Sequence, residues 1–518
     1  MSFGADLSKL IETSSSPLLG VAPSWSRTML GAVANIVNGF PFPSKGFNGK
    51  SGHPIIRIRD VTSGRTSTYF KGEAPEGFWV ENGDVLVGMD GDFNIRLWEG
   101  GRALLNQRVC KIAVNHMVYD KTFLVHLLPA YLSVINSATS SITVKHLSSR
   151  TIAQIPLPFP PLDEQKRIVS RLDSLQSHSR RAREALEKIP DLIEKFRQSV
   201  LAAAFRGDLT KEWREKNKGK IEPASELLKR IRIERRRKWE EEQLKKFKAA
   251  GKTPKDDSWK AKYKEPEPVD SDGLPELPEG WVWANSAEIC EKVDAGSTPP
   301  ANLMKSGAGD IPFIKVYNLC FDGRLDFTVN PTFVSHKTHA EKLGRSIVLP
   351  GDVLMNIVGP PLGKVSIVHD SDPEWNHNQA IVSFRPLALN NRILAYYLMS
   401  PLVLRKFNLD SQATAGQYNI SVSGSRELAV PVPPPEEQKE IQLIVDKAYR
   451  LSSTILELAR SSSNSYLTLD QSILGKAFRG ELVPQGPNDQ PSMAKPASKV
   501  TINTRKSERD KKQVVNKL

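Results

Sequence analysis

The segment IPLPFPPLDEQKR at residues 155–167 decides the fold, because it returns in altered form as LAVPVPPPEEQKE at residues 428–440. A second pair, AFRGDL at 204–209 and AFRGEL at 477–482, lies at the same offset of 273 residues. The stretch between the two motifs therefore has the same length in both copies. A repeat at a fixed interval has to be recognised before any fold is assigned. It predicts a chain of two similar halves, each with a variable block followed by a repeated helical block.

The repeated blocks have the apolar spacing of paired helices. After the prolines, apolar residues recur at alternating steps of four and three, as in a helix that packs along another helix. The prolines mark each start, and carboxylates at 163–164 and 436–437 suit the positive N-terminus of a helix. Phe-Arg-Gly ends each helix, with Gly207 and Gly480 suited to a left-handed C-terminal residue. Pro190 predicts a kink or break that the second copy does not share.

We expect these apolar seams to pack the two helices against each other and to serve the docking of partner subunits. Ser179 is the one polar residue in the first stripe, and Ser452 is its counterpart in the second. The predicted helix-pair and subunit-docking residues are Ile168, Leu172, Leu175, Leu186, Phe205, Ile441, Val445, Ile455, Leu469 and Phe478.

The variable blocks resemble each other more faintly. Each consists of short β-like runs with polar turns between them, which predicts a compact α+β domain. The offset between matching segments climbs from 258 to 273 residues, which indicates loop insertions in the second copy. The matches are IIRIR at 55–59 with FIKVY at 313–317, GDVLV at 83–87 with GDVLM at 351–355, Asn106-Gln107 with Asn378-Gln379, and His146-Leu147-Ser148 with Asn419-Ile420-Ser421.

Length and composition restrict the class of protein. A chain of 518 residues is too long for one core. Its net charge of +14 favours a polyanionic partner. The sequence lacks both an apolar stretch of membrane-spanning length and the pattern of a signal peptide, so we expect a cytoplasmic location. The three cysteines are too widely spaced to suggest a disulfide framework or a zinc site.

Two segments look accessory. Residues 211–264 are strongly helix-forming, and the basic run at 235–238 lies beside three glutamates at 240–242. A solvated helix with ion pairs between successive turns is favoured over a dedicated nucleic-acid contact. Residues 265–280 have the composition of a linker. The tail from about residue 485 is poor in apolar residues and is predicted to be disordered.

The sequence lacks most enzyme signatures. The sequence has neither the glycine-rich loop and catalytic turn of a DNA methyltransferase nor the G-x-x-x-x-G-K-S/T motif of a phosphate-binding loop. Glu164 and Lys166 form the E-x-K pattern of many nucleases, but they open a predicted helix, where capping explains the carboxylate. Two alternatives to DNA recognition stay open: a stand-alone metal-dependent nuclease using this pair, and a coiled-coil scaffold that binds only protein.

Recognition of duplex DNA is the function that the remaining residues favour. Arginine suits guanine, and asparagine or glutamine suits adenine, in the major groove. The loops of the two variable blocks carry such side chains, and the sequence does not show which of them contact bases. The predicted DNA-binding residues are Arg57, Arg59, Asp60, Arg65, Lys315, Tyr317, Asn318, Arg324, Gln417, Tyr418 and Asn419.

Residues 20–484 closely resemble the specificity subunits of Type I restriction-modification enzymes. The resemblance is carried by PLPFPPLDEQKRIV and PVPPPEEQKEIQ, by QSVLAAAFRGDLTKEWREKN and QSILGKAFRGEL, and by LPEGWVW before the second variable block. It implies two similar α/β target-recognition domains, each reading half of a bipartite DNA site. Two long antiparallel conserved helices would separate them and relate them as a pseudo-two-fold repeat of α+β class.

The resemblance also implies the partners. Two methyltransferase (M) subunits would bind S-adenosylmethionine and methylate adenine at N6 by base flipping. Motor-nuclease (R) subunits would use ATP and Mg²⁺ to cleave unmodified DNA. This chain itself would be non-catalytic, with no cofactor and no metal site. Its serine-rich N-terminal extension and lysine-rich tail depart from the simplest members of the family.

The expected division of the chain follows from the repeat and the resemblance together. In order, the segments are a flexible N-terminal extension at 1–19, the first target-recognition domain at 20–155, the first spacer helix at 156–210, the charged helical segment and linker at 211–272, the second target-recognition domain at 273–428, the second spacer helix at 429–484 and a disordered basic tail at 485–518.

Overall fold

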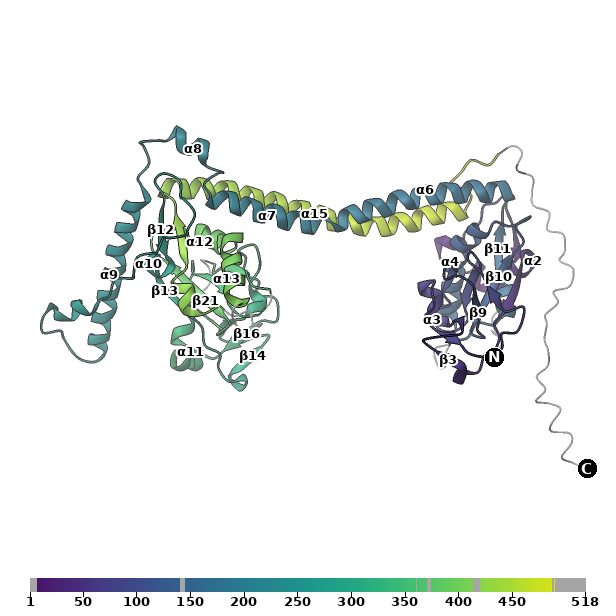
Figure 1. The fold of residues 1–518 in the computed structure, drawn as a ribbon, viewed down its shortest axis with the longest axis horizontal. Helices are drawn as coiled ribbons and strands as arrows, with labels where there is room; N and C mark the ends of the chain where they lie inside the picture. Colours follow the sequence, from purple (N-terminus) through teal and green to yellow (C-terminus); the bar gives the residue numbers. More distant parts are fainter. Residues whose placement is uncertain are drawn as a thin grey trace, which may run out of the picture. The chain divides into compact units, whose positions relative to one another are not determined.

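The chain forms two compact units, which are described separately (Figure 1). Unit 1 combines residues 1–187 with residues 460–518, and unit 2 consists of residues 188–459. Each unit therefore contains one variable domain and portions of both repeated helices. The computed structural model describes residues 7–139, 145–359, 361–369, 374–412, 420–486 and 489, and the side chains of 408–412 lie outside this description.

The described residues of each unit contain eleven strands. Those of unit 1 are β1 Ser26–Met29, β2 Ala34–Asn38, β3 Phe47–Asn48, β4 His53–Ile56, β5 Tyr69–Phe70, β6 Trp79–Val80, β7 Val85–Gly88, β8 Ile95–Leu97, β9 Ala103–Leu105, β10 Val109–Val114 and β11 Pro156–Phe159. Those of unit 2 are β12 Val282–Asn285, β13 Cys290–Ala295, β14 Met304–Ser306, β15 Ile311–Ile314, β16 Thr332–Val334, β17 Ile347–Val348, β18 Val353–Asn356, β19 Val365–Ile367, β20 Trp375–His377, β21 Ile381–Pro386 and β22 Ala429–Val432.

The helices are duplicated only in part. Those of the first half are α1 Leu7–Glu12, α2 Leu30–Val33, α3 Ile58–Ser63, α4 Lys121–Ala138, α5 Ser149–Ala153 and α6 Leu162–Glu187, with 3₁₀ turns η1 Pro17–Leu19 and η2 Ser44–Gly46. Those that follow are α7 Ile189–Phe205, α8 Lys211–Lys216, α9 Ala224–Ala249, α10 Ser286–Ile289, α11 His336–Lys342, α12 Asn391–Leu398, α13 Pro401–Gln412, α14 Val422–Arg426 and α15 Pro435–Phe478, with η3 Asp257–Lys262, η4 Ala301–Leu303, η5 Val316–Asn318 and η6 Gly344–Ser346.

The two variable domains have the same strand order. In unit 1 the sheets run β1-β11, β2-β10-β7-β8 and β3-β5-β4-β9-β6. In unit 2 they run β12-β22, β13-β21-β18-β19 and β14-β16-β15-β20-β17, so each strand number is raised by eleven. The parallel pairing of two named strands also recurs, as β4 with β9 and as β15 with β20. The prediction of two similar α+β domains is confirmed.

The main core of each unit extends from a sheet to the repeated helices. In unit 1, Val87 of β7 and Phe123 of α4 share a buried cluster with Leu172 of α6 and Phe478 of α15. In unit 2 the corresponding cluster joins β18 and β21 with α12, the end of α7 and the start of α15. Burial of large apolar side chains is the main stabilising contribution in such a core. Each variable domain is thus fixed to its own helix by the continuity of one core.

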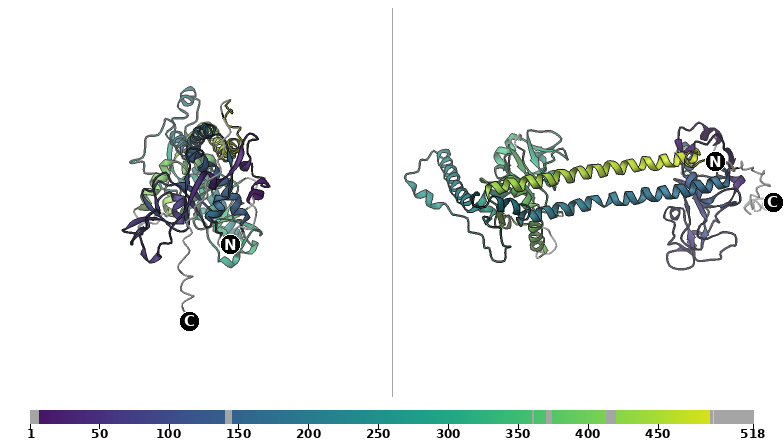
Figure 2. Two further views of the ribbon diagram at one scale, coloured as in Figure 1. Left: turned by 90° about the vertical axis from the view of Figure 1, so that its right-hand side faces the viewer. Right: turned by 90° about the horizontal axis from the view of Figure 1, so that it is seen from above.

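The repeated helices begin after the prolines and end before the glycines, as the sequence predicts. The segments expected to be spacer helices, 156–210 and 429–484, each open instead with a strand, β11 or β22, that pairs within the variable domain. The first copy is broken at Lys188 into α6 and α7, with Pro190 in the first turn of α7, where the missing N–H of proline is tolerated. The second copy is the uninterrupted 44-residue α15. Gly207 and Gly480 follow the two helix ends with φ of 75° and 70°, in the left-handed region. Within unit 1 α15 runs beside α6, and within unit 2 it runs beside α7 (Figure 2).

Helix α9 is part of unit 2 and not a detached appendage. Leu227, Leu228 and Ile231 lie in the main buried cluster of that unit. The basic run beside them is occupied by contacts within the protein: Arg235 donates to the carbonyl of Cys290 at 2.6 Å, and Arg236, Arg237 and Lys238 each pair with a glutamate. These contacts support the ion-paired helix and not the nucleic-acid contact. Over the described part of the chain, no helix has the length and apolar character needed to span a membrane.

Candidate nucleic-acid interface and docking helices

The glutamate of the repeated motif fastens each helix to its variable domain. Trp25 Nε1 donates to Glu164 Oε2 at 3.1 Å in unit 1, and Trp281 Nε1 donates to Glu437 Oε2 at 2.9 Å in unit 2. Both carboxylates are buried. Trp25 immediately precedes β1, and Trp281 immediately precedes β12. These strands pair with β11 and β22, the last strands before the repeated helices, so each hydrogen bond ties the domain to its helix.

The adjacent glutamine extends this connection to a second helix. Gln165 Oε1 accepts from the backbone N of Asp120, the N-cap residue of α4, at 2.7 Å, and its Nε2 donates to Pro160 O at 2.9 Å. Gln438 repeats the pattern with the backbone N of Asn390, the N-cap residue of α12, at 3.1 Å. A buried amide that satisfies its donor and acceptor in this way fixes the geometry of its neighbours. The Glu-Gln pair therefore has a structural role, which the sequence patterns did not identify.

This geometry does not favour a nuclease. Burial raises the pKa of Glu164, while its hydrogen bond from Trp25 opposes the shift. Lys166 points instead to Asp163, at 3.5 Å, on the exposed side of α6. Within the described ranges no group of three or more His, Cys, Asp or Glu side chains is arranged to hold a metal ion. The E-x-K residues thus serve helix packing and a surface ion pair.

In unit 1 the predicted DNA-binding residues surround the short helix α3. Arg57, Arg59 and Arg65 are exposed, and Arg59 Nη2 donates to Thr68 Oγ1 at 3.3 Å. Asp60 is buried and accepts a hydrogen bond from the backbone N of Arg57 at 2.8 Å. The structure therefore assigns Asp60 a positioning role in place of the predicted direct contact. A DNA contact by the three arginines stays a prediction.

In unit 2 the corresponding residues surround η5. Asn318 takes the place of Asp60, is wholly buried, and accepts from the backbone N of Lys315 at 2.9 Å. Its Nδ2 donates to two backbone carbonyls, so it too holds the loop. Tyr317 and Arg324 are exposed, and Arg324 pairs with Asp322 at 2.7 Å. Gln417, Tyr418 and Asn419 lie outside the described residues.

The predicted seam residues near each variable domain pack among three helices. Those nearer the middle of α15 are partly exposed. Ile168 and Leu172 pack against α4 as well as the end of α15, and Ile441 and Val445 pack against α12 as well as the end of α7. At these positions each helix therefore packs against its variable domain as well as against the other helix. Phe205 and Phe478 are also buried, Leu175 and Leu186 are half-buried, and Ile455 and Leu469 are 36% and 46% exposed.

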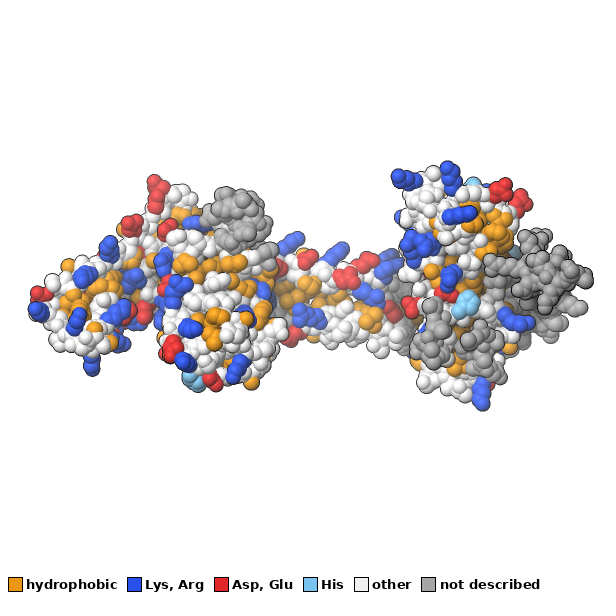
Figure 3. Space-filling view, turned by 90° about the horizontal axis from the view of Figure 1, so that it is seen from below, with side chains coloured by type: hydrophobic (Ala, Val, Ile, Leu, Met, Phe, Trp, Pro, Cys, Tyr) orange, Lys and Arg blue, Asp and Glu red, His pale blue; other side chains and the backbone are white. Residues whose placement is uncertain are grey.

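Several apolar side chains on the helices remain at the surface. Figure 3 shows hydrophobic side chains among the charged ones on these helix segments. A series of exposed apolar residues on helices is typical of a protein interface. The most exposed of them are Leu192, Leu443, Leu451, Leu458, Leu467 and Leu469.

The serine in each stripe contacts a charged side chain of the opposing helix. That side chain is an anion in unit 1 and a cation in unit 2. In unit 1, Ser179 Oγ donates to Asp470 Oδ1 at 2.7 Å, and Arg183 joins the same carboxylate at 2.7 Å. In unit 2, Arg197 Nε donates to Ser452 Oγ at 2.8 Å. Arg197 and Asp470 occupy equivalent positions, 273 residues apart. The same place in the repeat therefore carries a cation in one copy and an anion in the other.

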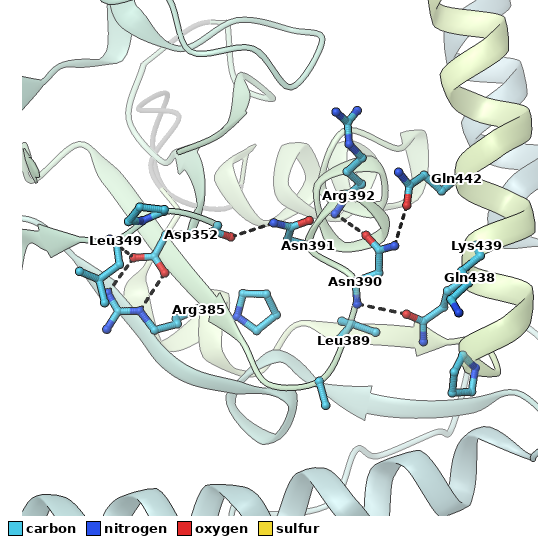
Figure 4. A pocket seen from close by; sticks show the side chains of 15 residues that line it. Leu349, Asp352, Arg385, Leu389, Asn390, Asn391, Arg392, Gln438, Lys439 and Gln442 are labelled. Carbon is cyan, nitrogen blue, oxygen red and sulfur yellow. Dashed lines mark hydrogen bonds and ion pairs between the residues drawn. The ribbon is translucent and has the colours of Figure 1, made fainter. Parts of the chain in front are cut away.

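A polar cavity of about 620 Å³ lies where the second variable domain meets α12 and α15 (Figure 4). Arg385 makes two hydrogen bonds to Asp352, both at 2.8 Å, and Asn390 Nδ2 donates to Gln442 at 2.7 Å. The lining residues include no cysteine, histidine or serine. These paired groups form a structural junction between the domain and its helices.

Comparison with known proteins gives a consistent family. A family described as the Type I restriction modification DNA specificity domain matches residues 24–190 and 278–460. The specificity subunit of the Type I restriction enzyme EcoBI from Escherichia coli is 36% identical over 95% of this chain and 94% of its own length. That of EcoKI, from E. coli strain K12, is 24% identical over 85% and 84% of the two chains.

Solved structures support the fold. The HsdS subunit from Thermoanaerobacter tengcongensis has a TM-score of 0.51 at 19% identity, covering 89% of this chain and 98% of its own. A structure described under complex assembly and conformational transition of the type I R-M system has a TM-score of 0.58, also at 19% identity, covering 89% and 99%. At this level of identity the likeness concerns the fold alone.

Proposed function

Because this chain belongs to the family of DNA specificity subunits of Type I restriction-modification enzymes, we propose that its two variable domains each read one half of a bipartite DNA site. The observation that carries the proposal is the duplicated strand order, which presents different side chains on matched backbone positions. Two copies of one scaffold with different surfaces suit two different half-sites. The net charge of +14 suits a duplex, whose phosphates dominate the affinity of such complexes.

The helices α6, α7 and α15 are proposed to dock two methyltransferase subunits in the cytoplasm. The exposed leucines of α15, among them Leu443, Leu451 and Leu458, support this assignment. S-adenosylmethionine would be bound by those subunits, and ATP and Mg²⁺ by the motor-nuclease subunits. This chain contributes recognition and assembly but no catalytic group.

The proposal is tested by exchanging residues 20–155 for the matching block of a relative and mapping methylated adenines across a genome. One half of the methylated motif should change and the other half should stay. The unexchanged chain, expressed in the same host, serves as the control. A motif that changes in both halves or in neither would contradict modular reading by the two domains.

A further inference from the structure

Three separate segments of unit 1 meet at the surface beside β7. They are the turn after β7, the residue before β10, and the residue two positions before the N-cap of α5. Backbone hydrogen bonds join them: Met89 N donates to Arg108 O at 3.0 Å, and Leu147 N donates to Met89 O at 2.7 Å. The side chains of Asp90, Arg108 and His146 are thereby brought together, although they are up to 56 residues apart.

The carboxylate of Asp90 holds the other two side chains. His146 Nδ1 lies 2.6 Å from Asp90 Oδ1, and Arg108 Nη1 donates to Asp90 Oδ2. Asp90 is only 9% exposed, whereas Arg108 and His146 are 60% and 57% exposed. Burial by itself raises the pKa of Asp90, but the hydrogen bonds from His146 and Arg108 outweigh it and leave this pKa below its ordinary value. The cluster therefore holds two exposed side chains, a guanidinium and an imidazole, in fixed positions on a buried carboxylate.

The turn that carries Asp90 is itself fixed. Phe93 is buried in the left-handed region, with φ of 52°, a conformation that a bulky residue adopts only when its surroundings impose it. Gly91 N donates to Lys145 O at 3.1 Å, and Asn136 Nδ2 donates to Gly91 O at 2.5 Å. The position of the carboxylate is therefore set by the fold and not by the two side chains that it binds.

Unit 2 repeats this backbone without these side chains. Ile357 N donates to Ala380 O at 2.9 Å, and Ile420 N donates to Ile357 O at 2.9 Å, which reproduces both bonds of unit 1. Val358, which is 43% exposed, stands in the place of Asp90, and Ala380 stands in the place of Arg108. The charged cluster is thus a property of one copy on a scaffold that both copies share.

We propose that Arg108 and His146, held by Asp90, form a base-reading site of the first variable domain, with guanine as the base that Arg108 contacts. This rests on the proposed reading of one half-site by each domain. The negative charge of Asp90 offsets that of Arg108 and so weakens the attraction of Arg108 to phosphate. The other N–H groups of the Arg108 guanidinium stay free of hydrogen bonds among the described residues, and their direction is fixed. Arginine donors fixed in direction suit the O6 and N7 acceptors of guanine in the major groove. Val358 and Ala380 have no such donors, so the second domain reads a different feature at this place.

The test uses the full chain assembled with its methyltransferase subunits and a library of duplexes with randomised half-sites. Arg108→Lys keeps the charge but removes the planar fork. Discrimination at one position of the first half-site should fall about tenfold or more, the usual range for a bidentate pair. The second half-site and the salt dependence of binding should not change. Asp90→Asn should weaken discrimination at the same position, because it frees Arg108 without removing it.

Arg102→Lys is the matched control, since Arg102 is 63% exposed in the same domain and pairs with Glu81. It should leave both half-sites unchanged. Transfer of the cluster by Val358→Asp with Ala380→Arg should alter preference in the second half-site only. Thermal unfolding and co-purification with the methyltransferase establish that each variant is folded and assembled.

Two results would overturn the inference. An unchanged motif in Arg108→Lys and Arg108→Ala would show that the cluster only stabilises the turn. A uniform loss of binding on all sequences in Arg108→Ala, with a shallower salt dependence, would assign Arg108 to a phosphate. Either result leaves the half-site proposal intact, because that proposal fails only if exchange of the whole block leaves the motif unchanged or alters both halves.

Discussion

Leu105 ends β9 in unit 1, and His377 ends β20 at the same place in unit 2. Each lies opposite an isoleucine in a parallel pair of named strands of its domain, Ile56 in the first case and Ile314 in the second. Both are wholly buried, yet neither ring nitrogen of His377 has a hydrogen-bond partner among the described residues. The scaffold therefore tolerates divergence inside its core as well as on its surface. The two variable domains share one backbone arrangement but differ in their side chains, so the effect of each difference can be tested at a matched pair of positions.

The largest expected effect comes from the helix positions where the copies agree. Leu172 and Val445 are equivalent and wholly buried. We expect Leu172→Asp and Val445→Asp each to destabilise its own unit by about 4 kcal/mol, because both bury an unpaired charge. Ile455→Asp, at a position 36% exposed, should cost under about 1 kcal/mol but weaken methyltransferase docking. Chemical denaturation and co-purification measure the two effects, and equal stability losses at all three positions would contradict the assignment of Ile455 to a docking surface.

The next effect concerns the buried glutamates, which differ in their partners. Glu437 is bonded by Trp281, by Thr210 Oγ1 at 2.6 Å and by Arg214, whereas the bond from Trp25 is the main one to Glu164. Arg214→Met should destabilise unit 2 by about 3 kcal/mol, since it leaves a buried carboxylate without its cation. Trp25→Phe should destabilise unit 1 by about 1–2 kcal/mol. Urea unfolding of the two variants measures the difference, and an equal loss would show that the cation adds nothing.

A smaller, pH-dependent effect should distinguish His377 from Leu105. Burial lowers the pKa of His377 to about 3, and the charges of Lys292 and Arg345 act in the same direction. The unfolded chain takes up a proton near pH 6.5, so this residue lowers stability as pH falls from about 6.5 towards 3. His377→Leu should raise the stability of unit 2 by about 1–2 kcal/mol at pH 7 and reduce its loss in mild acid. Denaturation midpoints at pH 7.5 and pH 5 test this, with Leu105→His as the reciprocal variant, and an unchanged pH slope in both would refute it.

The smallest expected change in stability comes from the contact of Asp470 on α15 with Ser179 and Arg183 on α6. Asp470→Asn keeps a hydrogen-bond acceptor for Ser179 but removes the charge that Arg183 contacts. A half-exposed pair of this kind should contribute no more than about 1 kcal/mol. Arg197→Gln at the equivalent place should have a larger effect, because Arg197 is buried over the ring of Tyr449, 4.8 Å from its centroid. Thermal unfolding in low and high salt separates the two, since only the Asp470 variant should lose its salt dependence.

Much of the fold could be predicted from the repeat, because an ungapped offset specifies equal helices and matched starts and ends without knowledge of any contact. Pro190 and the two glycines after the helices act through local backbone geometry, so their effects could also be predicted. The role of Glu164 could not, since its partner Trp25 is 139 residues away and nothing local distinguishes a helix-capping carboxylate from one held by a distant ring.

The candidate interface was the least predictable part. Asp60 and Asn318 have side chains typical of base contacts, but each is used to close its own turn. The cluster of Asp90, Arg108 and His146 could not be predicted, because its members are far apart in the sequence. Its three members look unremarkable in sequence and become a candidate site only because the fold brings three separate segments together. The matching of His146 with Asn419 was the one signal available, since it marked a position where the copies align but the chemistry changes.

Unit 1 is assembled from both ends of the chain, while unit 2 is one continuous stretch. During synthesis, residues 7–187 leave the ribosome before unit 2, but Ile473, Ala477 and Phe478, which complete the cluster around Leu172, leave only after it. Unit 2 has all of its residues once position 459 has emerged. The half of the protein that is made first is therefore the half that must wait, with an apolar face uncovered, until all of unit 2 has been made.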